Sequence, residues 1–357
     1  MKGAEMSGFL SLFFVTVLLL DYASGENDFE ETIGAVQDDL MMTALESDRV
    51  NPEIEELLTN LEDMAATADK LKQDGEHLGD PEEIYDDMIK VVADITDAVR
   101  NTNNAYKFLK ANGLERIVRH NFKINYDELK THIIILLKVL FEVAPTTTSS
   151  VIPITVVDRL LEIFEKDNLA LKAHSLDVLY AWLPENPSVQ ARVMKTKGFA
   201  PFYEQVPKLD TSVIKTLLDL FNSILKEHLR ARNDVQRTVV DNDKMKFYLR
   251  IGLLEHMSSP LVCNGLLNIF LKTWSYNTDD NDIIVTVFDM IKNIKPFCLK
   301  AFRGKMKAKQ LFTALQAYVK DTENIEYFES NGLNVTDISL VIEEYVNKLK
   351  YSVKDEM

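Results

Sequence analysis

The sequence predicts an all-α fold, an armadillo- or HEAT-like helical-repeat solenoid that follows a flexible acidic N-terminal segment. Apolar residues recur at helical spacing from residue 84 onward. Glycine (12) and proline (10) are scarce among the 357 residues, which disfavours a loop-rich β fold. A glycine-centred signature also recurs along the chain, as in repeat proteins. These observations predict four parts: residues 1–25, 26–85, 86–350 and 351–357.

Residues 1–25 have the form of a secretory signal peptide. Lys2 gives a weakly positive start, and an apolar run extends from Phe9 to Leu20. The small residues Ala23, Ser24 and Gly25 follow, so we expect cleavage after Gly25. The alternative, an uncleaved anchor, would need about 20 apolar residues to cross the hydrocarbon. We therefore expect no membrane insertion once the signal is removed.

The negative charge of the chain is concentrated in one segment. Residues 26–87 contain 21 Asp/Glu and 3 Lys/Arg, a balance of −18, whereas residues 88–357 contain 33 and 36, a balance of +3. Such an acidic segment repels itself, so we expect 26–85 to be largely disordered with short helices, one beginning near Pro52. It would serve as a solubilising tether or as a lure for another protein. The acidity argues against nucleic-acid binding, which needs a basic stripe.

The body is expected to be helical because its apolar residues fall on single helix faces. This periodicity predicts helices over 127–143, 168–183 and 211–228. Proline interrupts helical hydrogen bonding. The prolines of the body should therefore separate helices: Pro145, Pro153, Pro184, Pro187, Pro201, Pro207, Pro260 and Pro296.

The recurring signature is a glycine with an apolar residue five positions before it and another directly after it. It occurs at Gly113, Gly198, Gly252 and Gly332, which are 85, 54 and 80 residues apart. Two of these gaps are near twice a period of about 40–42 residues, the length of a HEAT or armadillo unit. The middle gap indicates one unit plus an insertion, for which 229–243 is the candidate. We expect each glycine to adopt a left-handed conformation where a helix ends.

Cys263 and Cys298 do not have the spacing of a zinc site or of a C-x-x-C motif. In an oxidising compartment they could form a disulfide. The alternative, which the sequence slightly favours, is two buried thiols on separate helices. The sequon Asn334-Val335-Thr336 permits glycosylation of Asn334.

No motif that carries chemistry is present. The chain has no glycine-rich phosphate loop, no G-x-S-x-G elbow and no H-E-x-x-H pair. Its six histidines are scattered, and Trp182 and Trp274 are expected to anchor the core. We therefore expect no catalytic residues, no cofactor and no metal, and the chain is not predicted to be an enzyme.

Stacked helical repeats leave an extended concave surface that binds proteins. The candidate contacts are polar residues opposite the apolar face of each helix that would line this groove. For each of them, an ordinary solvated surface position is the alternative. The candidates are Lys138, His174, Asp177, Asp219, Asn222, Lys226 and Asn268.

The segment HSLDVLYAWLPENPSVQARVMKTKGFAPFYEQV (174–206) resembles the armadillo repeat of the nucleotide-exchange factors of DnaK-type chaperones. In those repeats a helix, an Asn-Pro pair, a second helix, a glycine and a third helix follow one another, as around Asn186-Pro187 and Gly198. Residues 97–118 are similar to the first repeat of the family, with Asn104, Ala105 and Phe108 in its core. The resemblance covers residues 86–350.

The two ends of the chain indicate which branch it resembles. The chain ends in Lys354-Asp355-Glu356-Met357, close to the Lys-Asp-Glu-Leu signal for retention in the endoplasmic reticulum. With the signal peptide, the resemblance implies the lumenal branch, the exchange factors associated with the chaperone BiP. Fungal members carry paired cysteines near the N-terminus, whereas none precedes Cys263 here.

The resemblance implies a monomeric co-chaperone in the lumen of the endoplasmic reticulum. Such a protein binds the ATPase domain of BiP, holds its nucleotide cleft open and promotes ADP release, which supports protein folding and translocation. The alternative is a lumenal helical-repeat scaffold that binds another protein or peptide.

Overall fold

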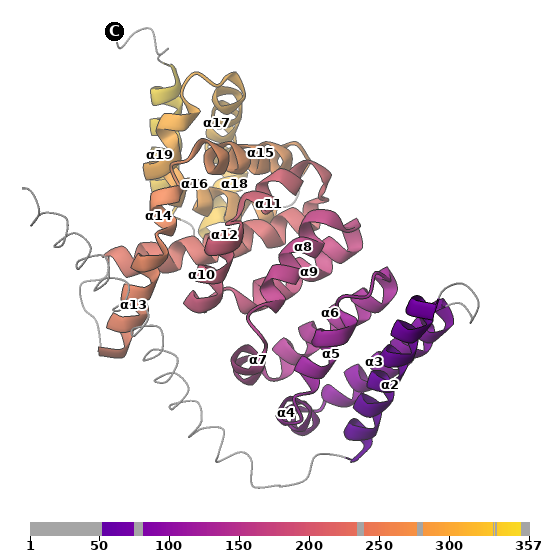
Figure 1. The fold of residues 1–357 in the computed structure, drawn as a ribbon. Helices are drawn as coiled ribbons and strands as arrows, with labels where there is room; N and C mark the ends of the chain where they lie inside the picture. The colour runs from indigo at the N-terminus through magenta and orange to yellow at the C-terminus, as the bar shows by residue number, and fades with distance from the viewer. Residues whose placement is uncertain are drawn as a thin grey trace, which may run out of the picture. The chain divides into compact units, whose positions relative to one another are not determined.

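A computed structural model describes residues 52–74, 81–233, 239–276, 281–330, 332 and 334–350. Within these ranges the chain is all-α and contains no strand, and its helices pack on one another in sequence order (Figure 1). This confirms the predicted helical-repeat solenoid. The predicted signal peptide, most of the acidic segment before Pro52 and the C-terminal tail 351–357 lie outside the described residues.

The acidic segment is folded over its described residues, 52–74 and 81–85. Helices α2 (Pro52–Asp74) and α3 (Pro81–Val99) pack on each other. Ile54, Leu58 and Leu61 recur on one side of α2, and each is at most 1% exposed. The helix predicted to begin near Pro52 is therefore confirmed. The prediction that it would be short and part of a largely disordered segment was wrong, because its apolar residues form a complete helix face that its acids do not interrupt.

The acids of α2 also have a specific partner. Arg116, on α5 (Gly113–Asn121), donates from Nε and from one terminal nitrogen to the two oxygens of Glu62, both at 2.7 Å. Its other terminal nitrogen donates to Glu55 at 2.8 Å. A guanidinium that grips a carboxylate through two parallel bonds fixes orientation as well as charge. Arg116 therefore sets the position of α2 on α5.

The next helices form three-helix units of the predicted length. α4, α7 and α10 begin at residues 102, 145 and 187, so the units are 43 and 42 residues apart. The first unit is α4 (Thr102–Lys110), α5 and α6 (Asp127–Val143). The second is α7 (Pro145–Val151), α8 (Val156–Lys166) and α9 (Leu169–Trp182). The third is α10 (Pro187–Thr196), α11 (Ala200–Gln205) and α12 (Thr211–Asn233), with the short 3-10 helix η1 (Val206–Lys208) before α12.

The remaining helices continue the stack with longer elements. They are α13 (Val239–Ile251), α14 (Leu253–His256), α15 (Pro260–Tyr276), α16 (Asn281–Phe302), α17 (Met306–Val319), α18 (Thr322–Ser330) and α19 (Val335–Lys350). Two details differ from expectation. The candidate insertion 229–243 is helical where it is described, since it ends α12 and begins α13. Pro296 lies inside α16 instead of between helices.

The long helices form one row through the stack. α3, α6, α9, α12, α16 and α19 pack side by side in that order, and we call this set the long-helix row. A second row contains α8, α11, α15 and α17, each packed on the next. A single cluster of buried apolar residues runs from Ile54 to Leu349 and joins the rows. Each unit therefore completes its core with residues of its neighbours.

The signature glycines serve two different purposes. Gly198, Gly252 and Gly332 have φ of 61°, 69° and 73°, the left-handed conformation that was predicted. At the first corner the left-handed residue is Asn112 instead, with φ of 54°. Gly113 is required by packing, because a Cβ there would lie 2.4 Å from Cε2 of the Phe108 ring.

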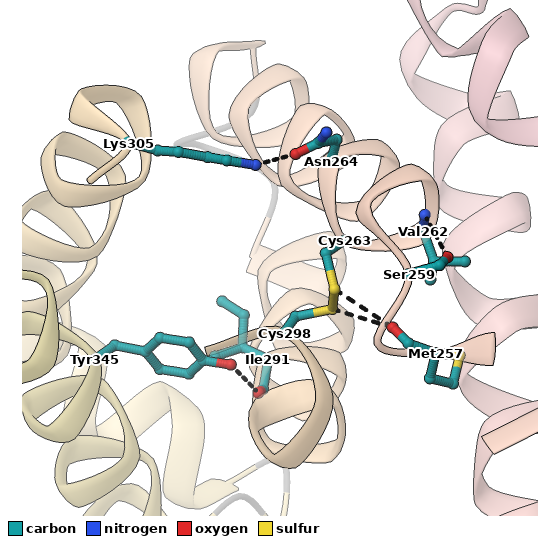
Figure 2. The surroundings of a disulfide bond; sticks show 9 residues. All are labelled: Met257, Ser259, Val262, Cys263, Asn264, Ile291, Cys298, Lys305 and Tyr345. Atoms are coloured by element: carbon teal, nitrogen blue, oxygen red, sulfur yellow. Dashed lines mark hydrogen bonds between the residues drawn. A yellow bond between two sulfur atoms is a disulfide. The ribbon is translucent and has the colours of Figure 1, made fainter. Parts of the chain in front are cut away.

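Cys263 on α15 and Cys298 on α16 form a disulfide, so the favoured alternative of two separate thiols was wrong. Figure 2 shows the bond between the two sulfur atoms, and both residues are fully buried. Their 35-residue separation gives no register, and it is the packing of α15 on α16 that brings the two sulfur atoms together. Closing a loop of this length stabilises a fold by about 4 kcal/mol through restriction of the unfolded chain.

We expect Gly113→Ala to lower the free energy of unfolding by about 1–3 kcal/mol, because the added methyl overlaps the Phe108 ring. Urea unfolding followed by circular dichroism measures this cost. The cost should shrink in a Phe108→Leu background, where the ring is absent. An equal cost in both backgrounds would show that the ring is not the reason for the glycine.

Candidate partner-binding surface

One side of the long-helix row carries most of the predicted contact residues. On α9, Leu176 and Leu179 are fully buried, whereas His174 and Asp177 are half-buried and Tyr180 is 45% exposed. The same division holds along α6 and α12. We call the outward sides of α6, α9, α12 and α16 the polar face. It presents side chains from successive units on adjacent helices.

Lys138 of α6 and Asp177 of α9 form an ion pair across neighbouring units, with Nζ and Oδ2 3.0 Å apart. Their side chains are 42% and 34% exposed. Pairs this exposed contribute about 0.2–1 kcal/mol. Both side chains can therefore exchange their mutual bond for contacts with a partner at small cost.

Asp219 and Lys226 of α12 are both bonded to α16. The Thr286 hydroxyl donates to Asp219 Oδ1 at 2.8 Å, and Lys226 forms an ion pair with Asp289. Burial raises the pKa of Asp219, and its bond to Thr286 only partly offsets this. Lys226 remains exposed, so it is the more accessible of the two.

Asn222 joins the same two helices from within. It is 6% exposed, donates to Asp289 Oδ2 at 2.7 Å and accepts from Asn293 Nδ2 at 2.9 Å. Its prediction as a contact residue was wrong, because both polar atoms of its amide are used inside the structure. The sequence could not supply this result, since it depends on the register of α16 against α12.

The other predicted residues lie apart from these pairs. Asn268 is exposed on α15, in the second row, so its assignment to the same surface was wrong. Asn334 is exposed directly before α19, and its Oδ1 accepts the backbone N–H of Asp337 at 3.1 Å. Asn334 therefore caps α19 through its Oδ1. Its Nδ2, the atom to which a glycan would be attached, takes no part in this hydrogen bond.

A buried polar network that the sequence pattern does not predict lies where α10, α12 and α13 meet. Glu227 accepts from Gln190 Nε2 and from the Glu185 backbone N–H, both at 2.9 Å, and from the Tyr248 hydroxyl at 2.8 Å. His228 Nε2 lies 2.9 Å from Gln190 Oε1. His228 continues the apolar stripe of α12 one turn after Ile224, which was the available signal of a buried histidine.

The network fixes the protonation states of its members. Gln190 Nε2 donates to Glu227 and to the Leu183 carbonyl, so its Oε1 must accept, and His228 carries its proton on Nε2. Burial lowers the pKa of His228 to about 4 and raises the pKa of Glu227. The network ties α10, α12 and α13 together, and Gln190, His228 and Tyr248 are buried within it.

Within the described part of the chain, no three His, Cys, Asp or Glu side chains gather as metal ligands would. None of its helices combines the length and the apolar character that crossing a bilayer requires. The arrangement is thus one of polar and charged groups displayed on packed helices.

No protein-family model and no curated protein matches this chain. Solved structures include matches, among them an engineered protein that is 10% identical, with 87% of this chain and 98% of that chain covered and a TM-score of 0.28. A similarity of this level carries no argument about function.

We expect Asn222→Asp to lower the free energy of unfolding by about 1–3 kcal/mol, because a carboxylate would replace the donor that faces Asp289. Thermal unfolding measures the loss. Asn268→Asp is the matched control, since the same change at an exposed site should cost no more than about 0.5 kcal/mol. Equal losses in both variants would contradict the role given to Asn222.

The His228 imidazole should make stability depend on pH. Its folded-state pKa of about 4 lies below the ordinary 6.5, so its stabilising contribution is complete above pH 6.5 and is lost as pH falls toward 4. Between pH 7 and pH 5 this amounts to about 2 kcal/mol. The raised pKa of Glu227 acts in the opposite direction, so the quantity to measure is the difference between wild type and His228→Gln. A difference that does not change between pH 7 and pH 5 would contradict the burial of a neutral histidine.

Proposed function

We propose that this protein is a nucleotide-exchange factor for a lumenal DnaK-type chaperone of the BiP kind. In this proposal the polar face binds the ATPase domain of the chaperone and promotes ADP release. The observation that carries the proposal is the display of polar side chains from successive units on one row of long helices. The signal-like N-terminus and the Lys-Asp-Glu-Met end support the lumenal location.

The mechanism needs no catalytic residue, only a difference in affinity. If the polar face binds the nucleotide-free ATPase domain better than the ADP-bound form, ADP binding weakens by the same factor. A hundredfold weakening corresponds to about 2.7 kcal/mol. A few charged contacts that form in one state and not in the other can supply this difference.

Three charged groups of the polar face, Lys138, Asp177 and Lys226, keep part of their side chains accessible. They lie on α6, α9 and α12, so a single partner domain could touch three neighbouring units. Asp219 and Asn222 would act indirectly, by holding α16 against α12. The contribution of the acidic segment must be tested with deletions that end before Pro52, because α2 supplies Ile54, Leu58 and Leu61 to the core.

Stopped-flow release of a fluorescent ADP analogue from the purified lumenal chaperone tests the proposal. We expect the mature chain to accelerate release at micromolar concentration. The double variant Lys138→Glu/Asp177→Lys keeps an ion pair between α6 and α9 but reverses both charges that the partner meets. It should lose about tenfold or more of the acceleration at unchanged melting temperature.

The outcomes separate the alternatives. Release that is unaffected by the wild-type chain would exclude exchange activity. Binding to the chaperone without faster release would instead indicate a scaffold. Full activity of the charge-reversed pair would remove α6 and α9 from the contact surface.

A further inference from the structure

A second charged surface lies at the turn between α16 and α17. Residues 290–320 contain eight Lys/Arg and no Asp/Glu, in a chain whose net charge is −16. Five of these cations fall within ten positions around the turn. We call them the basic corner: Lys300, Arg303, Lys305, Lys307 and Lys309.

Three members of the basic corner are exposed and lack an ion-pair partner among the described residues. They are Lys300, Lys307 and Lys309. By contrast, Lys292 and Lys295 on the same helix α16 bind Asp337 and Glu344 of α19, at 3.0 and 2.7 Å. The two lysines near α19 are therefore neutralised within the fold, and Lys300, Lys307 and Lys309 are left for another anion.

The placement of Lys307 and Lys309 opposes local helix stability, whereas Lys300 lies in the last turn of α16, where the helix dipole favours a cation. α17 begins at Met306 with no side chain capping its free N–H groups and no acid in its first turn. Cations near a helix N-terminus are unfavourable, because the helix dipole is positive there. A local cost without a visible compensating contact is typical of functional positions.

Apolar side chains lie beside the cations. Met306 is 66% exposed and follows Lys305 directly. The Lys305 ammonium donates to the Asn264 side chain of α15 (Figure 2), which places the first turns of α15 next to the corner. Leu261, one turn before Asn264, is 46% exposed. The surface thus combines the three unpaired lysines, Lys300, Lys307 and Lys309, with two exposed apolar groups.

We propose that the basic corner, with Leu261 and Met306, is a docking site for an acidic polypeptide segment that carries apolar side chains among its carboxylates. Charge complementarity selects the carboxylates, and the two apolar groups favour a peptide over a purely ionic ligand. At physiological ionic strength charges act over about 8 Å, so the corner can attract a short acidic segment despite the negative charge of the whole chain. This site is independent of the proposed exchange activity.

Fluorescence anisotropy of the mature chain with a labelled peptide of glutamates interrupted by two leucines tests this proposal. Affinity should fall as salt is added. The variant Lys300→Glu/Lys307→Glu/Lys309→Glu should bind about tenfold or more weakly. The control variant Lys123→Glu/Lys195→Glu/Lys208→Glu changes net charge equally at exposed lysines elsewhere, so it should retain wild-type affinity.

Further binding measurements distinguish an acidic peptide with apolar side chains from other anionic ligands. Leu261→Ser/Met306→Ser should reduce binding of the glutamate–leucine peptide to the level of plain polyglutamate. Equal losses in the two lysine variants would show that net charge alone is responsible and would overturn the site. Equal affinity for a peptide with glutamine in place of glutamate would also overturn the site. So would tighter binding of anionic vesicles or of single-stranded DNA than of the peptide.

Discussion

The structure depends on the inability of any one unit to bury its own apolar surface. The helices of each unit are apolar on sides that only the neighbouring unit can cover. The buried cluster from Ile54 to Leu349 is the result, and it explains why α2 is part of the body despite its acidity. Whether a helix folds into the body thus depends on the apolar surface of the neighbouring helix. Charge on the solvent-facing side of the helix has little influence.

The same stacking gives the polar residues of the long-helix row two tasks. Asn222 and Asp219 lie where α12 meets α16, and their bonds hold the two helices in register. Lys138, Asp177 and Lys226 lie further out and keep enough exposure to meet a partner. Such a surface is preorganised, because the partly buried Asp219 and Asn222 fix the helix that carries the exposed Lys226.

Helical periodicity predicted α6 and α9 to within one residue at each end, since each buries a continuous face. It predicted the start of α12 as well, but α12 ends at Asn233 instead of at residue 228. It also predicted the left-handed glycines at three corners. The errors arise where a residue's role depends on a neighbouring helix. Asn222 satisfies an α16 carboxylate, Gly113 makes room for the Phe108 ring, and Cys298 meets Cys263. None of these contacts leaves a periodic signal. The Gln190–Glu227–Tyr248 network was missed for the same reason, because three helices contribute to it.

The central claim is that the polar face binds the chaperone's ATPase domain. Hydroxyl-radical footprinting of the complex tests this most directly, because reactive side chains lie on both kinds of surface. Tyr180 of α9 is 45% exposed on the polar side, and Met306 of α17 is 66% exposed at the basic corner. We expect the nucleotide-free ATPase domain to protect Tyr180 from oxidation and to leave Met306 unchanged. Unchanged oxidation of Tyr180, or protection of Met306 alone, would contradict the account.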